Sequence, residues 1–152
     1  MKPASVRAKG QNAERDVCKL LQAAINEVYS FNKLTETPQL VRNLQQTQNG
    51  GHDVSGLPWL SLEVKHHAKT APSKFRDWWD QTTRQAGDSM EPVLIYRSNG
   101  VPFRVRMFQW WHAGAVSGKL LVDISIEDFL KWFRWRLHHE VTIQLATVRR
   151  VS

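Results

Sequence analysis

The chain has 152 residues and a formal net charge of +7, because 21 lysine and arginine side chains outnumber 14 aspartate and glutamate side chains. This length suits a single domain with a sizeable core, and the charge favours a polyanionic partner, for which nucleic acid fits better than a membrane. No apolar run approaches the roughly 20 residues of a membrane span, and no apolar segment follows the basic N-terminus as in a signal peptide. A single cysteine, Cys18, cannot form an internal disulfide, and no set of four thiolate or imidazole ligands at zinc-like spacing is present. We therefore expect a cytoplasmic protein with one domain over residues 1–152.

The N-terminal segment Met1–Lys9 is basic and has few side chains that could pack. We predict a mobile arm, as is common at chain termini. It could contact the phosphates of a nucleic acid through Lys2, Arg7 and Lys9, or it could have no role.

Residues 11–29 have the apolar spacing of an amphipathic helix. Glu14 falls inside the apolar arc, whereas Arg15 points outward. A carboxylate on the buried face needs a charged partner or a metal-bound water, which makes Glu14 a candidate site residue. The alternative is a solvated acid in the first turn, where the helix dipole favours negative charge. The apolar arc consists of Ala13, Val17, Leu20, Leu21, Ala24, Ile25 and Val28.

Residues 40–65 are predicted to form strands and a turn. Leu40–Gln46 is a plausible strand that carries Arg42, and Leu60–Val64 alternates apolar and polar residues as a half-buried strand does. Glu63 and Lys65 then share a face that we expect to lie opposite the core. Between the two strands, the sequence Ser-Gly-Leu-Pro at 55–58 can turn the chain so that Asp53 approaches Glu63.

Asp53 and Glu63 are candidate ligands of a metal ion. Two carboxylates that converge repel each other unless a cation lies between them, and hard oxygen ligands suit Mg²⁺ or Mn²⁺. Such an ion can activate water and shield phosphate charge, and Lys65 could stabilise the negative charge that grows in the transition state. On its own the pattern is weak, and the alternative is an ordinary surface hairpin with an exposed Glu63 and Lys65.

The rest of the chain predicts two helices and three strands. A helix over residues 75–86 carries Gln81, which could orient a phosphate or could simply belong to a polar face. The apolar run Pro92–Arg97 predicts a central strand. The pair Asn99-Gly100 predicts a hairpin whose return strand offers Arg104 and Arg106. Ser125 and Asp128 resemble a capping box that opens a helix through about His139, and Val141–Val148 is predicted to form a last strand. This order indicates an α/β domain with a central mixed sheet flanked by helices.

These residues resemble the PD-(D/E)XK nuclease superfamily, through Asp53, a gap of nine residues and Glu63-Val64-Lys65. The proline of the superfamily name is absent, because His52 precedes Asp53. The stretch Lys9-Gly-Gln-Asn-Ala-Glu-Arg15, followed by an amphipathic helix, is most similar to the start of archaeal and phage Holliday-junction resolvases. The similarity extends from about Lys9 to Arg97.

The resemblance implies a restriction-endonuclease-like fold and a Mg²⁺-dependent endonuclease that cuts branched DNA as a homodimer, in the host cytoplasm if the protein is viral. It implies that Asp53, Glu63 and the Val64 carbonyl bind the metal, that Lys65 is the catalytic lysine, and that Glu14 and Gln81 complete the site. Two alternatives remain: a nuclease without junction specificity, and a basic nucleic-acid-binding module without catalysis. The residues that we predict to contact DNA are Lys2, Arg7, Lys9, Arg42, Lys69, Lys74, Arg104 and Arg106.

Overall fold

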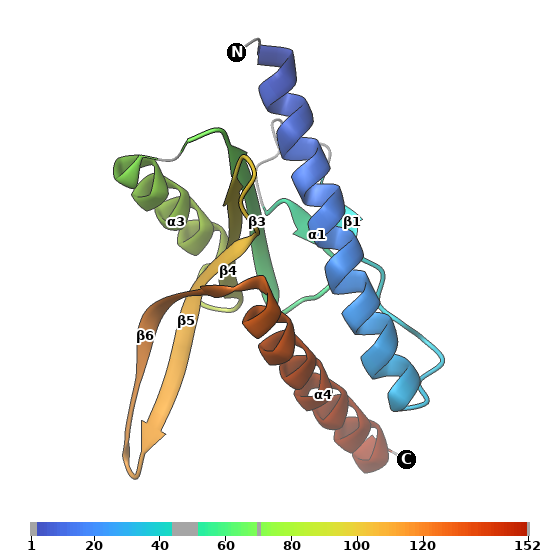
Figure 1. The fold of residues 1–152 in the computed structure, drawn as a ribbon. Helices are drawn as coiled ribbons and strands as arrows, with labels where there is room; N and C mark the ends of the chain where they lie inside the picture. Colours follow the sequence, from blue (N-terminus) through green and yellow to red (C-terminus); the bar gives the residue numbers. More distant parts are fainter. Residues whose placement is uncertain (1–2, 44–51, 70, 152) are drawn as a thin grey trace.

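The computed structural model describes residues 3–43, 52–69 and 71–151, which form one mixed sheet with helices on both faces (Figure 1). The six strands follow the chain in spatial order, β1-β2-β3-β4-β5-β6. In chain order the elements are α1 (Pro3–Phe31), β1 (Val41–Arg42), β2 (Val54–Ser55), β3 (Leu60–His67), α3 (Pro72–Ala86), β4 (Glu91–Ser98), β5 (Arg104–Ala113), β6 (Val116–Ser125) and α4 (Ile126–Val151).

The centre of the sheet is the parallel pair β3 and β4, which α3 connects. The remaining four pairs of neighbouring strands are antiparallel. A parallel pair needs such a crossover, and helices then cover both faces of the sheet. The predicted α/β class with a central mixed sheet is therefore confirmed.

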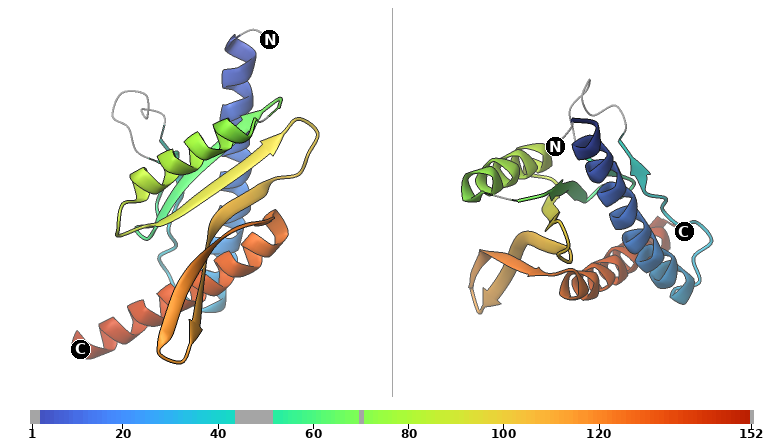
Figure 2. Two further views of the ribbon diagram at one scale, coloured as in Figure 1. Left: turned by 90° about the vertical axis from the view of Figure 1, so that its left-hand side faces the viewer. Right: turned by 45° about the horizontal axis from the view of Figure 1, so that its top comes forward.

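The two faces of the sheet have separate apolar layers. Along β4, Val93 and Ile95 pack with the core side chains of α1 and α4, whereas Leu94 packs against Trp78 and Trp79 of α3. Figure 2 shows α3 on one side of the sheet and the two long helices on the other. Because β4 is buried on both faces from residue 92 to residue 95, the prediction of a central strand here is confirmed.

The face of β3 that carries Glu63 and Lys65 is not solvated as we predicted. Glu63 is paired in register with Leu94 and Lys65 with Tyr96, so both lie on the side that α3 covers. Glu63 has no exposed surface. The alternation of apolar and polar residues in β3 predicts a single buried face, but α3 covers the polar face of this strand as well.

Helix α1 begins at Pro3, so the prediction of a mobile arm over residues 1–9 is wrong for the part that the structure describes. Proline fits the first turn of a helix, where its missing N–H has no partner to lose, and alanine, arginine and lysine in the following turns favour helix. Of the predicted apolar arc, Leu20 is exposed and the other members are buried.

Helix α4 begins as predicted, since the Asp128 N–H donates to Ser125 Oγ over 3.1 Å. It continues to Val151, so the predicted strand Val141–Val148 is wrong. Its β-branched residues suggested a strand, but Val141 instead extends the buried helical stripe of Phe129, Phe133 and Leu137. In the part of the chain that the structure describes, no helix is long and apolar enough to cross a bilayer.

The predicted strand Leu40–Gln46 is present only as Val41–Arg42, and its residues from 44 onward lie outside the described part of the chain. The turn before β3 depends on Gly56, whose φ is +128°. A Cβ atom there would collide with the carbonyl oxygen of Gln39. This glycine lets the segment before β1 approach the end of β2, and β2 follows Asp53 directly.

We predict that Gly56→Ala lowers the free energy of unfolding by roughly 3 kcal/mol or more, because the new side chain adds a backbone clash to an unfavourable φ. The matched control is Gly87→Ala, where φ is +58° but a Cβ meets no atom within 4 Å. We expect that variant to lose only about 1 kcal/mol. Urea titration of both variants checks the difference, and equal losses would contradict the proposed collision.

Candidate active site

A cleft of about 270 Å³ lies at the carboxyl end of β3. One wall of the cleft is the N-terminal part of α1, and another includes Arg42 and Asn43. Asp53 lies between Asn43 and β3. The α1 residues come from the same face of the helix, at spacings of three and four. The cleft is lined by Val6, Arg7, Gly10, Gln11, Glu14, Arg42, Asn43, Asp53, Val64, Lys65, His66 and His67.

Asp53 is held against the edge of β3 by two hydrogen bonds. Its backbone N–H donates to the Leu62 carbonyl over 2.9 Å, and its Oδ2 accepts from the Val64 N–H over 2.6 Å. The Asp53 carboxylate thus accepts the Val64 N–H of β3 in the place of a backbone carbonyl of a neighbouring strand. Asp53 is only 4% exposed, so most of its hydration is lost.

Glu63 links β3 to α3 within the buried layer. Its Oε1 forms an ion pair with Lys65 Nζ and accepts a hydrogen bond from Gln81 Nε2 over 3.2 Å. Lys65 remains partly exposed, at 22% of its side-chain surface, while Glu63 has none. These contacts bring Glu63, Lys65 and Gln81 together, and their catalytic roles stay predictions.

The electrostatics of Asp53 and Glu63 leave negative charge in excess. Burial, and after it the nearby Glu63 carboxylate, raise the pKa of Asp53 to about 7, although the Val64 N–H and the Lys65 ammonium act in the opposite direction. The Lys65 ammonium thus lies near two buried carboxylates, as the ion-pair partner of Glu63 and as a charge that lowers the pKa of Asp53. A second cation would stabilise this arrangement.

The donors around Asp53 fit a hard divalent cation. Asp53 and Val64 line the cleft, whereas Glu63 is not one of its lining residues and has no exposed surface. Because the N–H of Val64 points at Asp53, its carbonyl lies along the same edge of the strand. Among the described residues, no three His, Cys, Asp or Glu side chains form a metal cluster. Mg²⁺ suits a site with so few protein ligands, since it usually keeps several water molecules as ligands.

Glu14 lines the cleft but is paired with Arg42, not with the other acids. The Arg42 guanidinium donates twice to Glu14 Oε2, over 3.1 and 3.2 Å, and joins α1 to β1. Of the two partners expected for a carboxylate at this position, a charged side chain or a metal-bound water, Glu14 has the charged one, and its role in the site stays a prediction. Both side chains are about one-fifth exposed, at 21% for Glu14 and 19% for Arg42.

The cations predicted to contact DNA lie in three places. Arg7 and Arg42 line the cleft, while Lys9 donates to Asn99 Oδ1 over 3.2 Å beside it. Lys69 follows β3 and Lys74 lies in the first turn of α3, both exposed. Lys2 lies outside the described residues.

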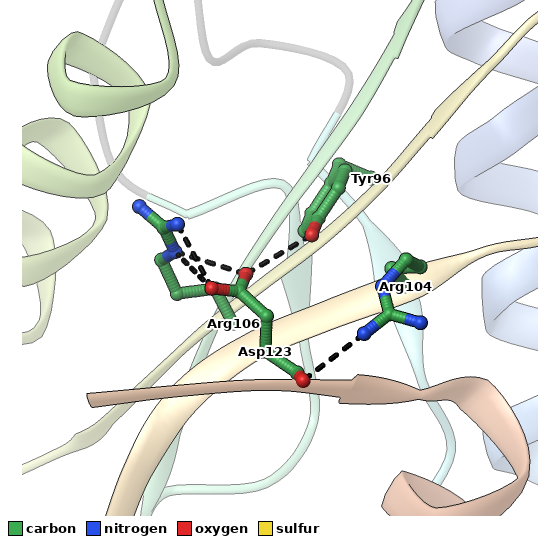
Figure 3. A network of polar contacts seen from close by, with 4 residues as sticks. All are labelled: Tyr96, Arg104, Arg106 and Asp123. Carbon is green, nitrogen blue, oxygen red and sulfur yellow. Dashed lines mark hydrogen bonds and ion pairs between the residues drawn. The ribbon is translucent and has the colours of Figure 1, made fainter. Parts of the chain in front are cut away.

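Arg104 and Arg106 lie away from the cleft, on β5, and both contact Asp123 of β6 (Figure 3). Arg106 forms a bidentate ion pair with the Asp123 carboxylate, over 2.9 to 3.2 Å, and Tyr96 donates to the same carboxylate over 3.0 Å. The Asp123 carboxylate balances the charge of Arg106. The predicted contacts of Arg104 and Arg106 with DNA phosphates stay predictions.

Sequence reasoning did not identify Gly10, Gln11 and Asn43 as cleft residues. A usable signal existed for the first two, because they lie four and three residues before Glu14 and therefore on its side of a helix. The predicted helix begins at Gln11, so the part of the cleft wall that Val6, Arg7 and Gly10 form was not predicted. Asn43 is held by donating its backbone N–H to the Asp53 carbonyl over 2.8 Å.

Comparison with known protein families agrees with this geometry. A family model described as "Phage putative PDDEXK endonuclease" matches residues 5–121. The chain belongs to this family. The match to the phage endonucleases extends from α1 into β6 and includes Glu14, Asp53, Glu63, Lys65 and Gln81, so the resemblance to the PD-(D/E)XK superfamily is confirmed. No curated protein and no solved structure matches the chain.

We predict that Asp53→Asn stabilises the metal-free protein at neutral and alkaline pH. The raised pKa means that the folded state binds a proton more tightly than the unfolded state, whose carboxyl has the ordinary pKa of 3.8. Folding stability is therefore fully present below pH 4 and falls as pH rises to about 7. Asparagine keeps an acceptor for the Val64 N–H but has no charge.

Thermal unfolding in chelator measures this effect. We expect the Tm of Asp53→Asn to exceed that of the wild type by on the order of 5 °C at pH 8 and to match it near pH 4. A wild-type protein that is the more stable of the two at pH 8 would show that the buried carboxylate is not destabilising.

Proposed function

We propose that the protein is a Mg²⁺-dependent endodeoxyribonuclease that hydrolyses phosphodiester bonds in branched DNA, with four-way junctions as its preferred substrate. The observation that carries this proposal is that buried Asp53 and Lys65 line the cleft, while the buried Glu63 carboxylate pairs with Lys65 and interacts electrostatically with Asp53. Membership of a phage endonuclease family supports DNA as the substrate class. The net charge of +7 agrees with a polyanionic substrate.

In this proposal Asp53, Glu63 and the Val64 carbonyl hold Mg²⁺, and Mn²⁺ can replace it. When bound, the ion would lower the pKa of a water molecule and shield the charge of the phosphate. Lys65 supplies a positive charge where negative charge grows at phosphorus. Gln81 orients Glu63 through its hydrogen bond, and Glu14 with Arg42 fixes the facing wall of the cleft.

The junction preference rests on the resemblance of the stretch from Lys9 to Arg15 to resolvases. A four-way junction is symmetric and needs two nicks, so we propose a homodimer with two sites. The exposed apolar side chains on the β5–β6 hairpin are candidates for the subunit contact, with Trp110 at 52%, Trp111 at 39% and Leu120 at 57% exposure. For a phage protein, the host cytoplasm is the place of action.

We predict that Glu63→Gln folds and binds DNA like the wild type but loses cleavage by at least about a hundredfold, because a charged oxygen ligand is replaced by a neutral amide of the same shape. The matched control is Glu140→Gln, which removes an acid paired with Arg136 on α4. It should cut normally. In a thermal-shift assay, Mg²⁺ should raise the Tm of the wild type and of the control but not of Glu63→Gln.

A labelled four-way junction and its matching linear duplex test the substrate preference. With Mg²⁺ the wild type should introduce paired, symmetric nicks in the junction and leave the duplex intact, and chelator should abolish cutting. Equal cutting of both would establish a nuclease without junction specificity. Binding without cutting in Mg²⁺ or Mn²⁺ would favour a binding module, and a fully active Glu63→Gln would refute the assigned site.

A further inference from the structure

Gly10 occupies an unusual place, inside a long helix and on the wall of the cleft. It lies in α1 between Arg7 and Glu14, on the same side of the helix, and lines the cleft with them. The first turns of α1 stand beyond the carboxyl end of β3, where Lys65 and the two histidines lie (Figure 1). Any strand of nucleic acid that reaches Asp53 from this side passes Gly10.

Neither backbone geometry nor packing explains a glycine at this position. The residue is helical, a conformation that every side chain except proline adopts readily. A Cβ atom built on Gly10 meets no atom of the described residues within 4 Å. Glycine is among the weakest helix formers because it loses the most backbone freedom on folding, so alanine would suit the helix better. What glycine contributes is open space on the cleft wall.

Flexibility is a poor explanation, because contacts on both sides of Gly10 fix this part of α1. Lys9 Nζ donates to Asn99 Oδ1 over 3.2 Å, and His66 Nε2 lies 3.1 Å from the same oxygen. Further along the helix, Arg97 pairs with Asp16 over 3.1 Å. The wall is therefore attached to β4 and to the loop between β4 and β5.

We propose that Gly10 is the point where the sugar–phosphate backbone of the substrate strand lies directly against α1; this inference rests on the proposed nuclease function. A bare helix surface allows the close approach of another backbone. Arg7, one turn earlier, supplies a charge for a phosphate, and the Gln11 amide supplies a donor next to it. These contacts position the strand and carry no sequence information.

The test compares Gly10→Ala and Gly10→Leu with Ala8→Leu, which places the same leucine side chain on the opposite, exposed face of α1. Gly10→Ala should raise the Tm by about 2–4 °C through helix propensity. In chelator, Gly10→Leu should bind junction and duplex DNA about tenfold more weakly and Gly10→Ala about threefold. With Mg²⁺, cleavage should fall at least as much, and Ala8→Leu should stay within about twofold of the wild type.

The outcomes separate this contact from the nuclease assignment. If the wild type cuts DNA and Gly10→Leu binds and cuts equally well, the contact is refuted and the nuclease stands. If the wild type binds without cutting and Gly10→Leu weakens binding, the contact stands and the nuclease assignment falls. A wild type that neither binds nor cuts DNA refutes both.

Discussion

The arrangement of the whole site depends on two carboxylates buried next to each other with one lysine between them and solvent. Such a pair is unfavourable in the isolated protein, so the fold must supply enough packing to hold it. It does so from three directions: α3 closes over Glu63, the edge of β3 binds Asp53, and α1 covers the opposite face of the sheet. Local stability is given up at the position where a cation and a phosphate would restore it.

The elements that sequence predicted well are those with local, self-contained signals. The amphipathic pattern of α1, the continuous apolar run of β4 and the Ser125 cap all act within one turn or one strand. The convergence of Asp53 with Glu63 could also be anticipated, because turn residues separate them and the motif suggested a reason for it. The family match supports that reading of the motif.

The features that sequence did not predict depend on distant partners. The burial of Glu63 follows from α3 crossing over β3, which no window around Glu63 contains. The pairing of Glu14 with Arg42 joins residues 28 positions apart. At the C-terminal end, β-branched residues favoured a strand, but Val141 joins the buried stripe of α4, and the residues after it continue the helix with exposed side chains.

Helix α4 lies wholly beyond the matched residues 5–121, yet Phe129, Phe133 and Leu137 occupy the centre of the core with α1 and β5. The catalytic segment is therefore not an autonomous folding unit. Cut at the family boundary, it would expose a wide apolar surface to water and would be prone to aggregate. Relatives that share only that segment must cover this surface in some other way, by a different C-terminal element or by another polypeptide. Evolution can therefore vary this covering layer while the acidic cleft stays fixed.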